Sequence, residues 1–131
     1  MNAAYPELVG AWDLLDCTDF HSDGTRSKPL GDAPRGQIMY SADGRVSAHL
    51  IPGGVGDTPA SAYIGYYGRY TVDLGARVVT HHVLGASPTE MIGTDLQRAF
   101  RVEGDRLILE APRPTGIARV FWQRASIRSG V

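Results

Sequence analysis

Two adjacent histidines, His81 and His82, lie in the largely apolar stretch VVTHHVLGASP at positions 78–88. Neighbouring residues of a β-strand point to opposite faces of a sheet, so only one of the two imidazoles can face the interior. We prefer His82 for the inward position, because Thr80 and Leu84 on its face form a mixed wall. A shift of the strand register by one residue would exchange the two roles.

An inward histidine in such a strand has two interpretations. Burial lowers the pKa of an imidazole and leaves a neutral ring that can accept a proton near pH 7, which is the chemistry of a general base. The alternative is that the ring is hydrogen-bonded to a tyrosine or a backbone carbonyl and only shapes a pocket.

Arg98 is the second residue that could do chemistry. In TDLQRAFRVE it shares a strand face with Thr94, Leu96 and Phe100, whereas the other face is charged, so we expect Arg98 to point inward. A buried guanidinium must be paired or must meet an anionic or carbonyl ligand, so Arg98 could clamp a carboxylate, an enolate or a 1,3-dicarbonyl oxygen. A salt bridge to Glu90 or Glu110 is an equally good explanation.

Tyrosines supply a third kind of group, since a phenol can donate a hydrogen bond to a developing oxyanion, although it more often packs as core. The candidate catalytic set is therefore His82, Arg98 and Tyr70. The candidate ligand-binding residues are Trp12, Tyr40, His81, Phe100 and Trp122.

No metal or cofactor is expected. Adjacent histidines that face opposite ways are poor metal-ligand spacing. The sequence also contains no P-loop, dinucleotide-binding fingerprint, nucleophile elbow or H-E-x-x-H motif.

The composition favours a single soluble domain over residues 1–131. The formal net charge of −1 argues against a nucleic-acid-binding protein. No targeting segment or long apolar run indicates a membrane, and the single cysteine, Cys17, fits a reducing compartment, so we expect a cytoplasmic protein. Apolar residues on the outward face of strand 77–87 would suit a homodimer.

Glycines and prolines divide the chain into short segments that resemble strands. The expected strands cover residues 8–20, 35–41, 45–51, 65–73, 77–87, 94–103, 106–112 and 116–124. Turn signals such as Asp43-Gly44 join them in hairpin order, and a meander of this length commonly closes into an up-and-down barrel. The irregular segment 52–62 is a candidate lid over one barrel end.

Several motifs occur in an order that resembles a known family. The chain opens a strand with Gly10-Ala11-Trp12, continues through YSADG, YGRYTVD, VTHHV, GTDLQRAF and GDRLIL, and ends with Trp122-Gln123-Arg124. This series resembles the small lipocalin-like domain proteins of the calycin type. The resemblance implies an all-β, eight-stranded antiparallel barrel with an internal cavity, in which the final arginine packs over the first tryptophan.

The resemblance and the candidate residues together suggest a function. We expect the protein to bind a hydrophobic, oxygenated small molecule and to catalyse a cofactor-free cyclisation, isomerisation or dehydration on it. The alternative is a non-catalytic carrier or sensor of a lipophilic metabolite. A third reading is an interaction module whose barrel is filled by side chains.

Overall fold

The computed structural model describes residues 5–53 and 63–125, and within these ranges the chain is all β apart from turns and one 3₁₀ turn. The strands are β1 (Gly10–His21), β2 (Arg26–Ser27), β3 (Arg35–Tyr40), β4 (Arg45–Ile51), β5 (Ile64–Asp73), β6 (Val78–Ser87), β7 (Asp95–Glu103), β8 (Arg106–Arg113) and β9 (Gly116–Arg124). The 3₁₀ turn η2 covers Thr89–Met91. The expected strands and the observed long strands agree to within two residues at each end.

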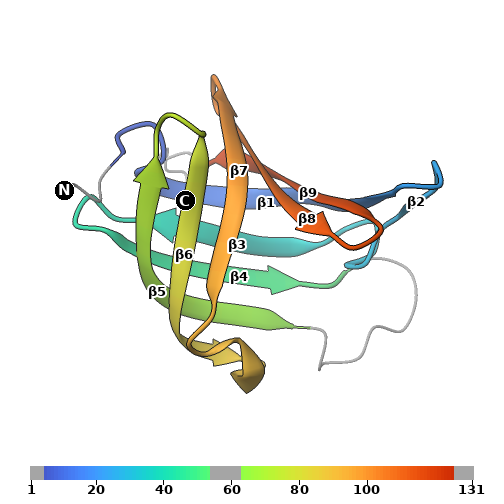
Figure 1. Ribbon diagram of the computed structural model, residues 1–131, viewed down its shortest axis with the longest axis horizontal. Coiled ribbons are helices and arrows are strands. Elements are labelled where there is room, and N and C mark those ends of the chain that lie inside the picture. The colour runs from blue at the N-terminus through green and yellow to red at the C-terminus, as the bar shows by residue number, and fades with distance from the viewer. Residues whose placement is uncertain (1–4, 54–62, 126–131) are drawn as a thin grey trace, which may run out of the picture.

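The strands form one antiparallel sheet that closes on itself. Each strand from β3 to β8 pairs with the next along the chain, β3 also pairs with β1, and β1 pairs with β9. The short strand β2 pairs only with β1, so the closed barrel has eight strands, as expected. Figure 1 shows how the wall curls over, with β6 and β7 running steeply across β3 and β4.

Glycines at the hairpins allow these tight connections. Gly44 follows Asp43 in the turn from β3 to β4 with φ of 92°, and Gly104 between β7 and β8 has φ of 61°. Both values lie in the left-handed region, where a residue without Cβ avoids a steric penalty.

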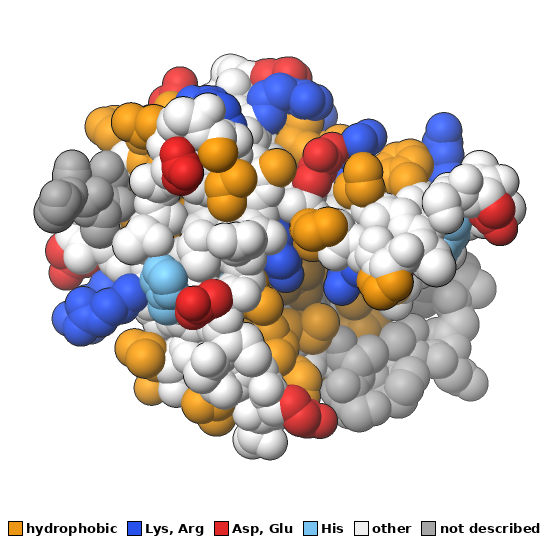
Figure 2. Space-filling model, viewed as in Figure 1, with side chains coloured by type: hydrophobic (Ala, Val, Ile, Leu, Met, Phe, Trp, Pro, Cys, Tyr) orange, Lys and Arg blue, Asp and Glu red, His pale blue; other side chains and the backbone are white. Residues whose placement is uncertain are grey.

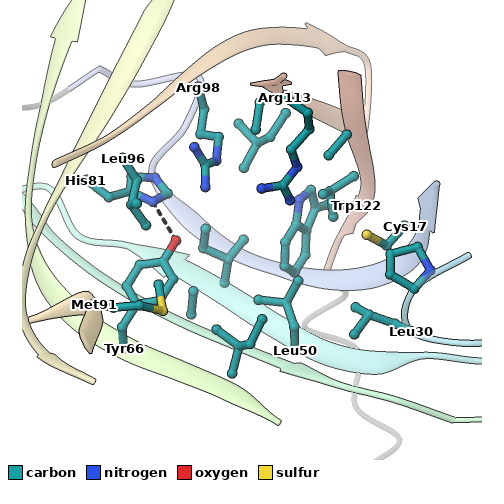
Figure 3. Close-up of a pocket in the computed structure, with 18 residues that line it drawn as sticks. Cys17, Leu30, Leu50, Tyr66, His81, Met91, Leu96, Arg98, Arg113 and Trp122 are labelled. Carbon is teal, nitrogen blue, oxygen red and sulfur yellow. Dashed lines mark hydrogen bonds between the residues drawn. The ribbon is translucent and has the colours of Figure 1, made fainter. Parts of the chain in front are cut away.

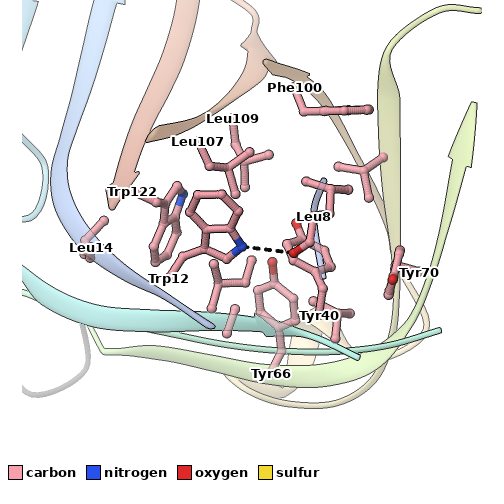
Figure 4. Close-up of a cluster of buried hydrophobic side chains, with 14 of the residues drawn as sticks. Leu8, Trp12, Leu14, Tyr40, Tyr66, Tyr70, Phe100, Leu107, Leu109 and Trp122 are labelled. Carbon is pink, nitrogen blue, oxygen red and sulfur yellow. Dashed lines mark hydrogen bonds between the residues drawn. The ribbon is translucent and has the colours of Figure 1, made fainter. Parts of the chain in front are cut away.

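One end of the barrel is filled by large side chains (Figure 4). Trp12 is completely buried there and donates from Nε1 to the carbonyl oxygen of Leu8 at 3.0 Å. The Arg124 guanidinium lies 4.1 Å from the Trp12 ring centroid and also donates to the carbonyl oxygens of Glu7 and Val9. The expected packing of the last arginine over the first tryptophan is therefore present.

Two irregularities change which residues face inward. Leu14 pairs with Trp122 and Asp16 with Phe121, so Leu15 is an extra residue in β1. In β6 the pairing with β5 skips Leu84. Each such bulge reverses the alternation of inward and outward side chains beyond it.

The described residues include no helix long and apolar enough to cross a membrane. They also include no group of three histidine, cysteine, aspartate or glutamate side chains placed to hold a metal ion. The candidate lid at 52–62 lies, except for its first two residues, outside the described part of the chain.

Candidate functional site

A pocket of about 180 Å³ lies inside the barrel wall, away from the end that Trp12 fills. We call it the barrel pocket. It is lined by Cys17, Pro29, Leu30, Ile38, Ala48, Leu50, Ile64, Tyr66, His81, Met91, Leu96, Arg98, Leu109, Ala111, Arg113, Ala118, Val120 and Trp122. Figure 2 shows a hollow on the viewed face, with hydrophobic side chains in its depth and basic side chains at its edge. Most of these lining residues are apolar, so an apolar ligand body would find matching walls.

The inward histidine is His81, and the expected orientation of His82 is wrong. His81 is 1% exposed and lines the barrel pocket. Val79, His81 and Val83, which are odd-numbered residues of β6, face inward. After the bulge at Leu84 the even-numbered Ala86 packs against the core instead. The alternation is therefore not continuous along the strand, which removes the basis for grouping Leu84 with the inward face.

His82 instead lies on the outer face of β6. Its Nδ1 is 2.9 Å from Asp95 Oδ1, its Nε2 is 3.0 Å from Thr71 Oγ1, and its side chain is 37% exposed. A residue held on the outer face cannot move a proton in the barrel pocket, so the mechanism based on His82 has no geometric support.

Both ring nitrogens of His81 are occupied by tyrosine hydroxyls. Nε2 is 2.7 Å from Tyr40 Oη, and Nδ1 is 2.7 Å from Tyr66 Oη. Burial, with smaller contributions from Arg98 and His82, lowers the pKa of His81 to about 3, so the ring is neutral at physiological pH. His81 thus matches the alternative reading of an inward histidine that is hydrogen-bonded to tyrosine and shapes the pocket.

Arg98 points inward, as expected, and its guanidinium extends into the barrel pocket (Figure 3). Its Nη1 donates to the carbonyl oxygen of Gln97 at 3.1 Å. Among the described residues neither Glu90 nor Glu110 pairs with it: Glu90 is exposed in η2, and Glu110 forms an ion pair with Arg119. Burial lowers the pKa of Arg98, and the nearby Arg113 lowers it further, whereas Tyr66 acts in the opposite direction.

Arg113 joins Arg98 at the pocket from the end of β8, as Figure 3 shows. It is exposed, and on its other side it borders a shallow surface hollow that Asp19 also lines. Arg98 is therefore the more enclosed of the two cations, and Arg113 lies nearer to solvent. None of the described residues that line the barrel pocket is acidic.

Trp122, which also lines the barrel pocket, has a buried hydrogen-bond donor without a partner in the described part of the chain. Its side chain is 2% exposed, and its Nε1 has no hydrogen-bond partner among the described residues. In Figure 3 this nitrogen lies on the side of the ring that faces the two arginines. A buried indole N–H without an acceptor is uncommon, because it loses its hydrogen bond to water without a replacement.

Besides His82, four residues that the sequence suggested for the site do not line the barrel pocket. They belong to the buried cluster that includes the filled end of the barrel: Trp12, Tyr40, Tyr70 and Phe100. Tyr70 donates its hydroxyl to the carbonyl oxygen of Ser41 at 2.8 Å, and its ring packs edge-on against Tyr40. These contacts give Tyr70 a packing role in the structure, whereas Tyr40 reaches the pocket only through His81.

Cys17 also lines the barrel pocket, from the part of β1 that follows the bulge at Leu15. Burial, reinforced by Asp19 and Asp16, raises the pKa of its thiol to about 11. The thiol is thus protonated at neutral pH and acts as an apolar part of the wall.

Sequence reasoning missed two polar residues of the pocket, Tyr66 and Arg113. The alternation of β5 placed Tyr66 on the same face as Tyr70, so the pattern could have predicted that Tyr66 points inward. Only the pairing of β5 with β6 shows that Tyr66 and His81 meet, however. Arg113 stands between two prolines at a turn, where alternation gives no direction.

Comparisons with known proteins agree with this architecture. A solved structure described as a redesigned β-barrel is similar over 96% of this chain and 98% of its own, with a TM-score of 0.53 and 15% sequence identity. At that identity the likeness supports the fold alone. The search of curated proteins found no match. The family model described as "Lipocalin-like domain" matches residues 9–125. The chain therefore belongs to the family of lipocalin-like domains.

Proposed function

We propose that the barrel pocket binds a small, mainly hydrophobic molecule that carries an anionic or carbonyl oxygen, and that Arg98 holds this oxygen. A lipocalin-like barrel fits the binding of small hydrophobic ligands in general. The observation that carries the finer proposal is the partly buried Arg98 guanidinium, which extends among mainly apolar walls where no described lining residue is acidic. A charge in such a place calls for an oppositely charged or strongly polar partner.

The size of the barrel pocket limits the ligand. A volume of about 180 Å³ is below the roughly 300–1,000 Å³ of pockets that enclose drug-sized molecules. We therefore expect a compact ligand of one or two rings, or a longer one that projects through the mouth beside Arg113.

The experiment uses three naphthalene compounds of nearly equal shape: 2-naphthoate, 2-acetylnaphthalene and 2-isopropenylnaphthalene. Their substituents are a carboxylate, a ketone and a hydrocarbon of the same branching. Because a hydrogen bond to a charged group contributes about 1.5–3 kcal/mol, Arg98→Met should weaken 2-naphthoate at least about tenfold. Binding of the isopropenyl compound should change little.

Two further variants control this titration. Arg101→Met removes an exposed arginine from the outer face of the same strand and should leave all three affinities unchanged. Val120→Phe narrows the barrel pocket and should weaken all three compounds, whereas Leu84→Phe on the outer face should not. Equal 2-naphthoate affinity in wild type and Arg98→Met would refute the proposed role of Arg98.

A second candidate function is cofactor-free catalysis. The observation that favours it is that the Tyr66 hydroxyl and the Arg98 guanidinium both reach the barrel pocket, from β5 and β7, and could polarise a carbonyl jointly. A base is harder to assign, because His81 is engaged at both nitrogens and burial raises the pKa of Tyr66 to about 12. A reaction here would rest on folding and polarising the substrate, as in a cyclisation, rather than on proton removal.

A further inference from the structure

The hydrogen bonds around His81 can run in two orders, which differ in the tyrosine hydroxyl whose proton they leave without an acceptor. A neutral imidazole carries one N–H donor and one acceptor nitrogen. His81 touches Tyr40 through Nε2 and Tyr66 through Nδ1. The position of the single ring proton therefore decides which tyrosine donates and which accepts.

Tyr40 determines this position. It is 2% exposed, and its hydroxyl has one partner among the described residues, Nε2 of His81. If Nε2 carried the proton, Tyr40 would accept it, and the hydroxyl proton of Tyr40 would stay buried without an acceptor. An unsatisfied buried donor is unfavourable, so Tyr40 donates to Nε2 and the ring proton lies on Nδ1.

This order of hydrogen bonds determines the role of the Tyr66 hydroxyl. Its hydroxyl oxygen accepts from Nδ1–H of His81, so its own proton must be donated elsewhere. Unlike Tyr40, Tyr66 lines the barrel pocket, and Figure 3 shows its oxygen at the wall where Arg98 enters. The hydroxyl proton is therefore available to the pocket.

We infer that the barrel pocket presents only hydrogen-bond donors to the polar end of its ligand, with Tyr66 as a specificity-determining donor and His81 and Tyr40 as positioning residues. The other donors are Arg98 and Arg113. Groups that carry only acceptors, such as a ketone or a carboxylate, match this set, whereas an ammonium group does not. This inference rests on the proposed function and specifies the chemical class of its ligand.

The first test measures the tautomer of His81 directly. Long-range ¹H–¹⁵N correlation spectra distinguish imidazoles protonated at Nδ1 from those protonated at Nε2, and a His81→Gln variant assigns the signals. We expect the Nδ1–H form at pH 7. An Nε2–H form, or a rapid mixture of both, would overturn the inference whether or not any ligand binds.

The second test compares 2-acetylnaphthalene with 2-isopropenylnaphthalene, which differ in having a carbonyl oxygen or a methylene group. Wild type should prefer the ketone by about two- to tenfold, the range of one neutral hydrogen bond. Tyr66→Phe should abolish most of that preference, and Tyr67→Phe, which removes a hydroxyl from the exposed face of the same strand, should retain it. A preference that is unchanged in Tyr66→Phe would overturn the role of Tyr66.

The two proposals fail in distinguishable ways. If none of the three naphthalene compounds binds in a manner sensitive to Val120→Phe, the proposed function fails, while the tautomer measurement still decides the hydrogen-bond order. The other outcome is that the compounds bind and Arg98→Met weakens the binding of 2-naphthoate, but Tyr66→Phe leaves the preference for the ketone unchanged. In that case only the further inference fails.

Discussion

His81 shows how a titratable side chain can be important in a barrel without being a base. Its ring is enclosed by Tyr40 and Tyr66, and its position ties β6 to β3 and β5 across the interior. Hydrogen bonds at both ring nitrogens fix the imidazole between the two tyrosines. Proton exchange with a ligand would require breaking one of them.

The low pKa of His81 predicts a pH-dependent stability. In the unfolded chain an imidazole binds a proton below its ordinary pKa of about 6.5, whereas burial lowers the pKa of His81 in the folded protein to about 3. Its contribution to folding is complete above the unfolded pKa and decreases as the pH falls toward the folded one. The slope for one proton is about 1.4 kcal/mol per pH unit.

Urea unfolding between pH 6.5 and pH 5 should reveal this slope. In the wild type the free energy of unfolding should decrease as the pH falls across this window. In His81→Gln the slope should be smaller by up to about 1.4 kcal/mol per pH unit, the value for one proton. Parallel curves for the two proteins would show that His81 takes up a proton while folded.

Cys17 offers a chemical probe of the barrel pocket, because it is the only cysteine of the chain. Its buried thiol, with a pKa raised to about 11, should react slowly with iodoacetamide at pH 8 and quickly once urea unfolds the protein. Saturating 2-naphthoate should slow the reaction of the folded protein further. Mass spectrometry measures the rates, and fast labelling of the folded protein would contradict the described burial.

At the scale of elements, the pairing of β5 with β6 determines the positions of Tyr66 and His81. The bulge that skips Leu84 lies between the pair of Tyr66 with Ala86 and the pair of His81 with Tyr70. The bulge therefore determines how the side chains of Tyr66 and His81 approach each other. Gly68 makes this approach possible, since a Cβ there would collide with the carbonyl oxygen of His82.

Gly68→Ala should therefore destabilise the barrel. The added methyl group meets backbone rather than a flexible side chain, so the two strands must separate, at a cost of about 1–3 kcal/mol. Gly75→Ala, in the exposed turn between the same strands, meets only Asp73 Oδ1 at 3.6 Å and should change stability by less than about 0.5 kcal/mol. Chemical denaturation compares the two variants, and equal stabilities would contradict the close strand contact.

The same bulge explains what sequence reasoning could and could not predict. Strand boundaries followed from turn residues such as Gly44 and Gly104, and the inward direction of Arg98 followed from an uninterrupted alternation on β7. The choice between His81 and His82 depended on an alternation that the bulge interrupts. Because bulges depend on pairing with a neighbouring strand, no local pattern in VVTHHVLGASP reveals this one.

At the scale of the whole molecule, the barrel divides into a filled part and the barrel pocket. Trp12, Arg124 and Phe100 belong to the filled part of the barrel, whereas the barrel pocket collects Arg98, Tyr66 and Trp122. The sequence analysis predicted several large aromatic residues as ligand contacts. Their distribution between the two regions depends on the closed topology and on long-range packing.

The outer surface also carries apolar side chains. Met39, Tyr67 and Leu84 are exposed and border one shallow hollow over β3 to β6. A homodimer through this face remains a prediction, which sedimentation velocity with wild type and Leu84→Lys would test.

The most direct test of ligand binding uses the chain's two tryptophans, which differ in environment. Nε1–H of Trp12 is bonded to the Leu8 carbonyl at the filled end, whereas Nε1–H of Trp122 is unpartnered at the barrel pocket among the described residues. In a ¹H–¹⁵N spectrum, titration with 2-naphthoate should shift the indole signal of Trp122 strongly and that of Trp12 little. Saturable binding that leaves the Trp122 signal in place would contradict the assignment of the barrel pocket as the ligand site.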